Sequence, residues 1–423
     1  SRAEVAMNKR VWIWNHYAGS MYEEQGGRHY AFAKYLRQAG YEPVVFCCNA
    51  RHGKAETYFP DTALWQVHVA SETDVPFVFV RGRTYEGNGK QRVLNMVDFF
   101  RNVKRAARAY AKARGQPDVI YASSVHPLTL VAGLQMAKHF GVPCVCEVRD
   151  LWPESIVAYS TRFTRDHPLI RLLYRGEKWI YQRADALIFT MEGGYDYITE
   201  RGWERAIPRS KVHCINNGVD LEQFREHRAR FQVEDADLQD PALFKVVYIG
   251  SIRRVNQLGA LLDAAKQVTD PTVHFLVWGD GDQRAALERR VQEEGITNVI
   301  FKGKVEKKYV PDIVTKADLN LIHGSNDGRS LLRFGISTNK MFDCFAAGKP
   351  ILMDIAAGYN PVEQFHAGVC VDCPEALPQA IAGLRQADGD VLGSLCRNAE
   401  HAAEAYDYRQ LTERLIKVLE KER

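Results

Sequence analysis

The sequence has no run approaching the roughly 18 consecutive apolar residues that a membrane-spanning helix needs. It also lacks a strong excess of one charge, because 56 lysines and arginines against 52 aspartates and glutamates leave a formal net charge of +4. A balance this mild does not indicate nucleic acid as a partner. The chain also shows no secretory signal pattern. We therefore expect a cytoplasmic protein, with at most peripheral attachment to the cytoplasmic face of a membrane.

A full set of two paired cysteine motifs is missing too. The nine cysteines are an odd number, and several lie in apolar, strand-like segments, as Cys47 and Cys48 do. This placement is typical of buried thiols in a reducing compartment. Cys370 and Cys373 have the spacing of metal ligands, but no second pair accompanies them, so we do not expect zinc there.

Two nucleotide-binding fingerprints are absent. No Gly-x-Gly-x-x-Gly segment follows the first apolar run, and Gly87-Asn-Gly-Lys90 lacks the upstream glycine of a P-loop. A polar loop with Gly26 and Gly27 follows instead, then a helical segment over 30–38 and an apolar strand over 43–48. This order opens a βαβ unit. Gly26 and Gly27 would let the backbone approach a phosphate, and a flexible turn is the plain alternative.

Short apolar runs alternate with helical segments along the rest of the chain, which is typical of parallel sheets covered on both faces. We expect an α/β protein of two Rossmann-like, doubly wound domains facing a central cleft, over 7–222 and 223–404. A charged helix over 405–423 should pack back on the first domain, and the polar stretch 226–241 is interpreted as a surface loop. The main predicted strands cover 11–14, 43–48, 77–80, 118–121, 143–150, 186–190, 212–215, 245–249, 273–278, 299–301 and 318–322, and the main predicted helices cover 30–38, 92–114, 128–140, 168–183, 258–267 and 283–294.

Ligands of such sheets bind beyond the carboxyl ends of the strands. His126 follows one predicted strand and precedes Pro127, and Arg149 and Asp150 end the next strand along the chain. We predict a site at these residues, together with the Gly26-Gly27 loop. An ordinary loop histidine and a structural ion pair between Arg149 and Asp150 are the alternatives.

The stretch 333–350 predicts a loop followed by a short helix. Ser337 or Thr338 can cap the start of this helix, and Gly348 with Pro350 ends it. An open helix N-terminus attracts anions, and Lys340 adds a full charge in the first turn. Asn339 and Asp343 lie four residues apart and share a face. We predict nucleotide phosphates at the tip of this helix and ribose hydroxyls at Asp343, with a merely solvated Asp343 as the alternative.

Four segments then follow one another along the chain: Cys214-Ile-Asn-Asn-Gly-Val-Asp220, Val277-Trp-Gly-Asp-Gly-Asp282, Asn298-Val-Ile-Phe-Lys-Gly303 and Ala347-Gly-Lys-Pro350. They resemble the retaining glycosyltransferases of family 4, which implies the GT-B fold. Other segments resemble a narrower subgroup, bacterial surface-polysaccharide enzymes such as O-antigen N-acetyl-fucosamine transferases: Asn15-His-Tyr-Ala18, Arg28-His29, Tyr85-Glu-Gly-Asn88, Glu147-Val-Arg-Asp-Leu-Trp-Pro-Glu-Ser155 and Gly335-Ile-Ser-Thr-Asn-Lys340.

The chain departs from the wider family at charged positions. Asp343 aligns with the family's ribose-binding glutamate, but the family's first glutamate, beside the donor sugar, is Gly335 here. The basic residues that neutralise the diphosphate would fall at Ser251 and Asn256, and neither is basic. At least one nearby cation should supply that charge instead. The candidates are Arg253, Arg254, Arg333 and Lys340.

The resemblance implies metal-independent, retaining transfer of an N-acetylated hexosamine or deoxyhexosamine from a UDP-linked donor to a lipid-linked or soluble glycan. Asp-x-Asp tripeptides begin at Asp235, Asp280 and Asp388, and none lies where a metal would meet a diphosphate, so no cofactor is expected. A nucleotide-sugar epimerase and an inactive homologue are the alternatives. The resemblance places Ser337, Asn339, Lys340 and Asp343 with Gly26 and Gly27 on the donor, His126, Arg149 and Asp150 at the reacting centre, and His16, Tyr17 and His29 on the acceptor side.

Two basic segments of the first domain predict contact with an anionic membrane surface. The segment 101–114 holds six lysines and arginines and no acidic residue. The segment 162–183 interleaves six basic residues with Leu169, Leu172, Leu173 and Trp179. The alternative is that the leucines are core and the arginines form a solvated face.

Overall fold

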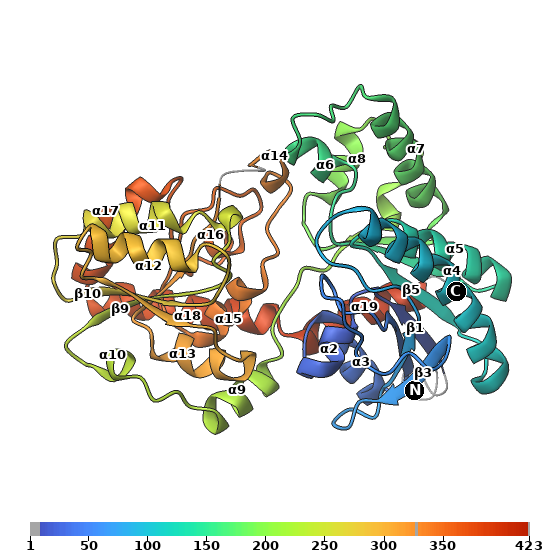
Figure 1. Ribbon diagram of the computed structural model, residues 1–423, viewed down its shortest axis with the longest axis horizontal. Coiled ribbons are helices and arrows are strands. Elements are labelled where there is room, and N and C mark those ends of the chain that lie inside the picture. The colour runs from blue at the N-terminus through green and yellow to red at the C-terminus, as the bar shows by residue number, and fades with distance from the viewer. Residues whose placement is uncertain (1–8, 326–328, 422–423) are drawn as a thin grey trace. The chain divides into compact units, whose positions relative to one another are not determined.

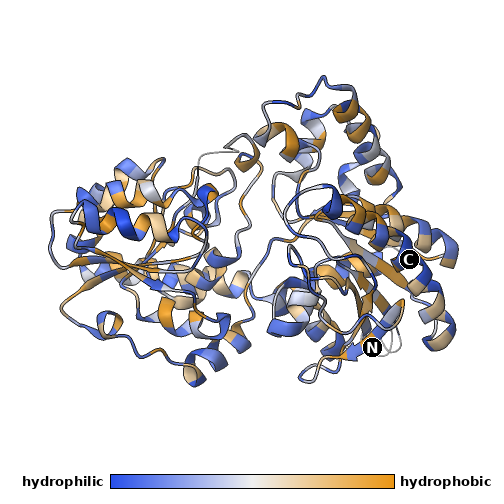
Figure 2. Cartoon of the chain, in the orientation of Figure 1, coloured by the Kyte–Doolittle hydropathy of each residue, from blue (hydrophilic) through white to orange (hydrophobic). Residues whose placement is uncertain are grey.

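A computed structural model describes residues 9–325 and 329–421 (Figure 1). The chain divides into two compact units. Unit 1 comprises the residues up to Asn216 together with the tail from Tyr408 onward, and unit 2 runs from Asn217 to Asp407. Each unit is built around its own sheet, and the strands of both sheets are mainly apolar (Figure 2).

The sheet of unit 1 has eight strands in the order β3-β4-β2-β1-β5-β6-β7-β8. Neighbouring strands are parallel except β3 and β4, which are antiparallel. The strands are β1 Arg10–Trp14, β2 Glu42–Cys48, β3 Trp65–Val69, β4 Pro76–Val80, β5 Val119–Ser123, β6 Cys144–Val148, β7 Ala186–Phe189 and β8 Val212–Cys214. The helices are α2 Gly19–Glu24, α3 Arg28–Gln38, α4 Lys90–Arg114, α5 Leu128–Phe140, α6 Glu154–Tyr159, α7 Pro168–Arg183, α8 Gly194–Glu200, η1 Arg209–Lys211 and α19 Tyr408–Lys421.

Helix α19 is the last element of the chain, yet it packs beside α3 in unit 1 (Figure 1). Leu411, Leu415 and Leu419 of α19 are buried in the same apolar core as α3. Polar contacts add to this packing, since Lys9 Nζ donates to the Leu419 carbonyl at 3.2 Å. Unit 1 is therefore assembled from both ends of the chain.

The sheet of unit 2 has six parallel strands in the order β11-β10-β9-β12-β13-β14. The strands are β9 Phe244–Ile249, β10 Val273–Trp278, β11 Val299–Gly303, β12 Leu319–Ile322, β13 Ile351–Met353 and β14 Gly368–Cys370. The helices are α9 Leu221–Arg230, α10 Ala236–Gln239, η2 Arg254–Asn256, α11 Leu258–Lys266, α12 Arg284–Glu293, η3 Lys307–Tyr309, α13 Val310–Lys316, α14 Arg329–Leu332, α15 Asn339–Ala347, α16 Pro361–Gln364, η4 Pro374–Ala376, α17 Leu377–Gln386 and α18 Gly389–Ala405. The predicted α/β class with two doubly wound sheets is confirmed.

The interpretation of 226–241 as a loop is wrong in part. Helix α9 extends to Arg230 and α10 covers Ala236–Gln239. Only Leu221 and Phe224 of α9 are buried, so a largely charged helix resembles a loop in composition. A second difference is β3, an antiparallel edge strand that alternation of strands and helices does not predict.

Candidate functional site

Unit 1 changes winding direction between β1 and β5, because β2 lies on one side of β1 and β5 lies on the other. Ligands of open α/β sheets bind at such a switch point. His16 follows β1 and His126 follows β5, and a hydrogen bond of 2.8 Å joins His16 Nδ1 to His126 Nε2. Tyr17 stacks on the His16 ring with centroids 4.5 Å apart. Three predicted site residues therefore lie together at the edge of the sheet where a ligand is expected.

A buried carboxylate, Glu147 of β6, organises the neighbouring groups and was not predicted as a site residue. It accepts two hydrogen bonds from Arg28, at 3.0 and 2.9 Å, and one from His29 Nε2 at 2.9 Å. Hydroxyl groups of Tyr121 and Ser123 also donate to it. Burial alone would raise the pKa of Glu147, but the Arg28 charge and the hydrogen bonds from His29 and Arg28 lower it well below its ordinary value. A glutamate inside an otherwise apolar strand is the sequence signal that could have indicated this network.

His29 belongs to that network and is fully buried. Its Nδ1 is 2.8 Å from Asn15 Nδ2, so both ring nitrogens have partners inside unit 1. Asn15 Oδ1 accepts from Arg149 Nη2 at 3.0 Å. His29 thus holds Asn15 and, through it, Arg149 in place. The geometry gives it a positioning role, whereas His16 and Tyr17 lie at the switch point itself.

Arg149 and Asp150 follow β6, beside the same edge. Arg149 Nε donates to the Ser124 carbonyl at 2.8 Å. The described residues contain no ion pair between Arg149 and Asp150, so the structural-pair alternative is not supported. Burial raises the pKa of Asp150 to about 6, against the opposing effects of Ser155, the Leu151 N–H and Arg149. Asp150 therefore takes up a proton at a higher pH than an ordinary aspartate does.

The glycine loop lies between α2 and α3. Gly27 is the residue before α3 and has φ 101°, a conformation that favours glycine. A Cβ at this position would lie 3.0 Å from Met21 Cγ. No side chain caps the start of α3. Gly26 and Gly27 thus lead the chain into an uncapped helix N-terminus, at the same end of the sheet as His16.

Unit 2 has its own switch point, between β9 and β12. Beyond it, two loops pack backbone against backbone. A Cβ on Gly279 would lie 1.8 Å from the Gly250 carbonyl oxygen, and one on Gly281 would lie 2.2 Å from that of Ile252. Gly279 also has φ 142°, so glycine is needed there on two grounds. These glycines bring the ends of β9 and β10 into close contact.

Lys340, in the first turn of α15, reaches the loop after β9. Its Nζ lies 4.8 Å from the centroid of the Tyr248 ring. A Cβ on Gly250 would lie only 2.7 Å from the same Nζ. Within the described residues this partly buried ammonium has neither an ion pair nor a hydrogen bond. Burial lowers the pKa of Lys340, although Cys344 and Asp354 oppose that shift.

The positions where the family resemblance expects basic residues form a neutral contact instead. Ser251 Oγ donates to Asn256 Oδ1 at 2.7 Å, and the Arg253 N–H donates to the same oxygen at 3.1 Å. The side chains of Arg253, Arg254 and Arg333 are exposed. Of the four candidate cations, Lys340 is therefore the one that burial and the Gly250 loop place at the switch point.

The start of α15 differs from the sequence prediction in one respect. Thr338 is the residue before the helix, but neither its side chain nor that of Ser337 caps it. The Ser337 carbonyl instead accepts from Asn217 Nδ2 at 2.8 Å. The prediction of a side-chain cap was thus wrong, and the first-turn N–H groups lack a side-chain acceptor. Such an N-terminus favours an anion.

Asn339 and Asp343 lie on α15 on either side of Lys340. Asn339 is exposed, while Asp343 is partly buried. Burial raises the pKa of Asp343 to about 7, and the Lys307 charge opposes this shift.

His323 and Asp354, at the ends of β12 and β13, form a fully buried pair that was not predicted. Their pairing depends on strands that adjoin only in the folded sheet.

All three Asp-x-Asp tripeptides have structural partners. Asp235 caps α10 and, with Asp237, pairs with Lys302. Asp280 lies 3.8 Å from Arg284, and Asp388 caps α18. No group of three or more His, Cys, Asp or Glu in residues 9–325 and 329–421 could hold a metal ion. The nine cysteines are all free thiols.

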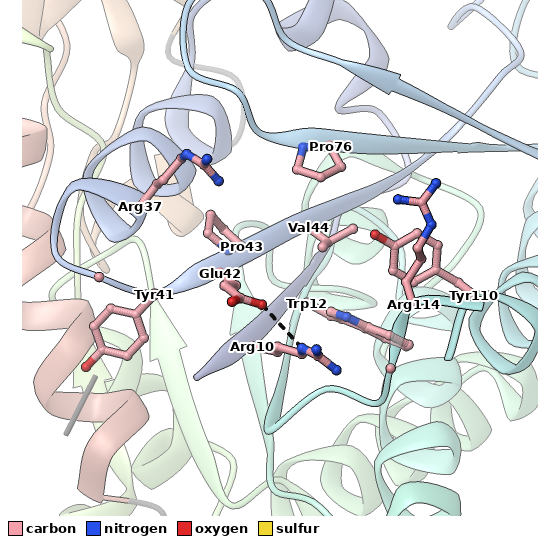
Figure 3. A pocket seen from close by; sticks show the side chains of 12 residues that line it. Arg10, Trp12, Arg37, Tyr41, Glu42, Pro43, Val44, Pro76, Tyr110 and Arg114 are labelled. Carbon is pink, nitrogen blue, oxygen red and sulfur yellow. Dashed lines mark hydrogen bonds and ion pairs between the residues drawn. The ribbon is translucent and has the colours of Figure 1, made fainter. Parts of the chain in front are cut away.

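A separate pocket of about 500 Å³ lies in unit 1 at the start of β1 and β2 (Figure 3). Arg10, Arg37 and Arg114 border it over an aromatic side formed by Trp12 and Tyr110. Arg10 is already paired with Glu42 at 3.3 Å. Because this pocket lies at the amino ends of the strands, it is distinct from the switch point at their carboxyl ends.

Comparison with protein families gives two matches. Residues 28–223 match Glycosyltransferase Family 4, and residues 244–386 match Glycosyl transferases group 1. The first match covers most of unit 1, and the second lies within unit 2. Each unit is therefore similar to a glycosyltransferase domain. None of the helices in the described ranges combines the length and apolarity needed to cross a bilayer.

Two curated protein sequences are distantly similar to this chain. The chain is 28% identical over 176 residues to the putative colanic acid biosynthesis glycosyl transferase WcaI of Escherichia coli, covering 38% of this chain and 41% of WcaI. It is 25% identical over 210 residues to the putative teichuronic acid biosynthesis glycosyltransferase TuaH of Bacillus subtilis, covering 49% of each. The matches thus span less than half the length of either relative.

Among solved structures, HepE (Alr3699) of Anabaena in complex with UDP matches over 98% of this chain and 100% of its own, with a TM-score of 0.64 and 15% identity. A likeness at this identity establishes the fold alone. The fold is therefore GT-B-like, as the sequence predicted.

Proposed function

We propose that this chain transfers a sugar from a nucleoside diphosphate donor to a glycan in the synthesis of a bacterial surface polysaccharide. The observation that carries the proposal is Lys340, a partly buried ammonium at the switch point of unit 2 that has no anionic partner within the described residues. A buried charge without a partner is costly, and a bound diphosphate would compensate it. The names of WcaI and TuaH support the polysaccharide context.

The donor is proposed to bind unit 2 at α15. The diphosphate would contact Lys340 and the uncapped first turn, and the ribose hydroxyls would reach Asp343, one helical turn further on. Asn339 lies on the same helix face as Asp343. Arg253, Arg254 and Arg333 are exposed and remain additional candidates for the phosphates. UDP is the proposed nucleotide because HepE, which shares the fold, has been crystallised with it.

The proposed reaction is retaining and needs no metal. The bond between the sugar C1 and the β-phosphate oxygen breaks, and a bond from the acceptor oxygen to C1 forms on the same face. The acceptor proton passes to the leaving phosphate oxygen. Lys340 and the α15 N–H groups would stabilise the charge that develops on the diphosphate. An N-acetylated hexosamine or deoxyhexosamine is proposed as the sugar from the subgroup resemblance.

Unit 1 is proposed to hold the acceptor and to contact an anionic membrane. The exposed side of α7 carries Leu169, Leu172 and Trp179, which are 49%, 61% and 37% exposed. The alternative that these leucines are core therefore fails for Leu169 and Leu172. Arg183 lies over the Trp179 ring at 4.6 Å, and Arg171 and Arg175 of the same helix are exposed. Basic side chains beside exposed apolar ones favour binding at a bilayer interface and hence a lipid-linked acceptor.

The donor site is tested by titration and thermal shift with nucleoside diphosphates and their sugars. A specific ligand should raise the melting temperature by mass action. Asp343→Ala should weaken binding of the preferred nucleotide by roughly 1–3 kcal/mol, the scale of a lost hydrogen bond to a charged group. Glu288→Ala, on the partly exposed surface of α12, is a control that should not change affinity. Unchanged affinity in folded Asp343→Ala would reject this ribose contact.

The reaction class needs a separate measurement. Mass spectrometry of an incubation with nucleotide-sugar and extracted glycolipid should detect an acceptor heavier by one sugar. An isomerised nucleotide-sugar without a heavier acceptor would indicate an epimerase. Binding without transfer, hydrolysis or isomerisation would indicate an inactive homologue.

A further inference from the structure

Asn95 of α4 is fully buried, and the two ends of its amide have different neighbours. The Nδ2 group donates to the Arg83 carbonyl at 2.8 Å. Because that carbonyl can only accept, the orientation of the amide is fixed. Asn95 Oδ1 therefore faces His16 Nε2, 2.9 Å away. An amide oxygen can only accept, so His16 Nε2 carries a proton.

In the described part of the chain, His16 has no carboxylate beside it that would stabilise a second proton on its ring. Within the described residues, neither His16 nor His126 forms an ion pair or a hydrogen bond with a carboxylate. Burial lowers the pKa of His16 well below its ordinary value, and the neighbouring His126, His52 and Arg92 act in the same direction. Neutral His16 then has an unprotonated Nδ1. This nitrogen must accept from His126 Nε2, which lies 2.8 Å away.

The proton on His126 Nε2 decides the state of the other ring nitrogen. Burial, followed by the charges of Arg92 and Arg149, lowers the pKa of His126 to about 4, so the ring is neutral at physiological pH. His126 Nδ1 is then a bare acceptor. It is buried and has no hydrogen-bond partner in the described part of the chain. A buried polar atom without a partner needs an explanation, and at the switch point of the sheet a ligand group supplies one.

The groups around His126 show what can approach it. His16 and Tyr17 come from the loop after β1, Arg92 from α4, and Arg149 from the end of β6. Arg92 and Arg149 are both cationic, and the Tyr17 ring stands edge-on to the imidazole with centroids 6.1 Å apart. No anion among these groups would draw a proton onto Nδ1.

We infer that Asn95 and His16 are positioning residues that fix His126 as the Nε2–H tautomer, so that His126 Nδ1 accepts a hydrogen bond from a hydroxyl or amide N–H of the bound sugar. The identity of the ligand as a sugar rests on the proposed function. The direction of the hydrogen bond does not, because it follows from the chain of donors and acceptors in unit 1. A sugar position that offers only a carbonyl or ether oxygen would leave Nδ1 unsatisfied.

The tautomer can be measured directly in the free protein. Long-range ¹H–¹⁵N correlation spectra of the histidine-labelled full chain separate the two neutral tautomers and the imidazolium, and His126→Gln assigns the signals. We expect neutral His126 with its proton on Nε2. A proton on Nδ1, or an imidazolium at neutral pH, would overturn the inference.

Variants test whether Asn95 and His16 set the tautomer. His16→Phe removes the acceptor for His126 Nε2, and Asn95→Leu frees the His16 ring, so both should produce a mixture of His126 tautomers. His16→Gln keeps an acceptor and a donor and should retain the Nε2–H form. His16→Phe and Asn95→Leu should lower the transfer rate about tenfold, which is the effect of one misplaced hydrogen bond. Both variants should leave nucleotide affinity unchanged. An Nε2–H signal that persists in folded His16→Phe and Asn95→Leu would show that neither residue sets the tautomer.

Failure of the tautomer inference can be distinguished from failure of the proposed function. A wrong tautomer with intact transfer overturns the inference alone. The expected tautomer in a chain that transfers no sugar overturns the proposed function and leaves the hydrogen-bond direction standing. Where a variant does not fold, the wild-type spectrum still shows which ring nitrogen of His126 carries the proton.

Discussion

Asp343 is the acidic residue at which burial and proposed function meet. Its pKa is raised to about 7, chiefly by burial, from an ordinary value of 3.8. A carboxyl group whose pKa is higher in the folded chain contributes stability below its unfolded pKa and loses that contribution as the pH rises through the folded value. The partly buried carboxylate is therefore destabilising to the free protein at neutral pH, and a bound nucleotide would offset this.

The pH dependence of stability tests this reading of Asp343. Over the interval from 3.8 to about 7, the free energy of unfolding of the wild type should fall relative to that of Asp343→Asn, which does not titrate. Denaturant unfolding at several pH values within this interval measures the difference. Other titrating groups cancel because both proteins share them. Parallel stability curves would show that Asp343 has an ordinary pKa.

At this scale sequence reasoning selected some of the residues that the fold places at the two switch points, and it missed others for one physical reason. His126 follows a strand and Lys340 begins a helix, so the position of each in a local pattern predicted a site, whereas His16 was predicted from the family resemblance. Glu147 and Asn95 take their roles from partners that are distant in sequence, such as Arg28, which lies 119 residues before Glu147. Pairing of this kind depends on which strands become neighbours, and local patterns do not contain that information.

At the scale of elements, the prediction succeeded where periodicity was strong. Helices over 128–140 and 168–183 have the predicted bounds, because Gly141 ends the first and Pro168 begins the second. The prediction of a loop in the polar stretch that includes the end of α9 failed because few side chains of α9 are buried. The prediction of a side-chain cap at the start of α15 failed for a different reason. Thr338 has the residue type and position of a cap, yet its side chain does not make the bond.

Helix α7 carries the membrane proposal, and its exposed leucines allow a direct test. Leu169→Glu with Leu172→Glu should reduce co-sedimentation with anionic vesicles, because the change removes apolar contact and adds like charge. Val391→Glu in α18 is a matched control, since Val391 is also apolar and 49% exposed. Wild-type binding should fall as salt rises. If the wild type stays in the supernatant at low salt, a soluble acceptor becomes the better account.

At the scale of the whole molecule, the two units have parallel designs. Each places polar groups at the carboxyl ends of the strands beside its switch point: His16 and His126 in unit 1, and the Gly250 loop with His323 in unit 2. The duplication was predictable from the alternation of strands and helices. The assignment of α19 to unit 1 follows from its apolar face, which packs with α3.

We predict that the transfer reaction does not need a divalent metal. The Asp-x-Asp tripeptides of the chain have structural partners such as Lys302, and Lys340 would supply positive charge for the diphosphate. Transfer measured by product mass should therefore persist after dialysis against EDTA. Turnover that disappears with EDTA and returns with Mg²⁺ or Mn²⁺ would contradict this prediction.

The central claim is that Lys340 and the start of α15 bind the diphosphate of the donor. Calorimetric titration of UDP into wild type, Lys340→Met and Lys349→Met tests it most directly, because Lys349 lies just beyond the opposite end of α15. We predict that Lys340→Met weakens UDP binding roughly tenfold or more, the scale of a lost hydrogen bond to a charged group, and that Lys349→Met does not. Binding of uridine, which lacks phosphates, should be insensitive to either change. UDP affinity that is the same in folded Lys340→Met and in the wild type would contradict the account.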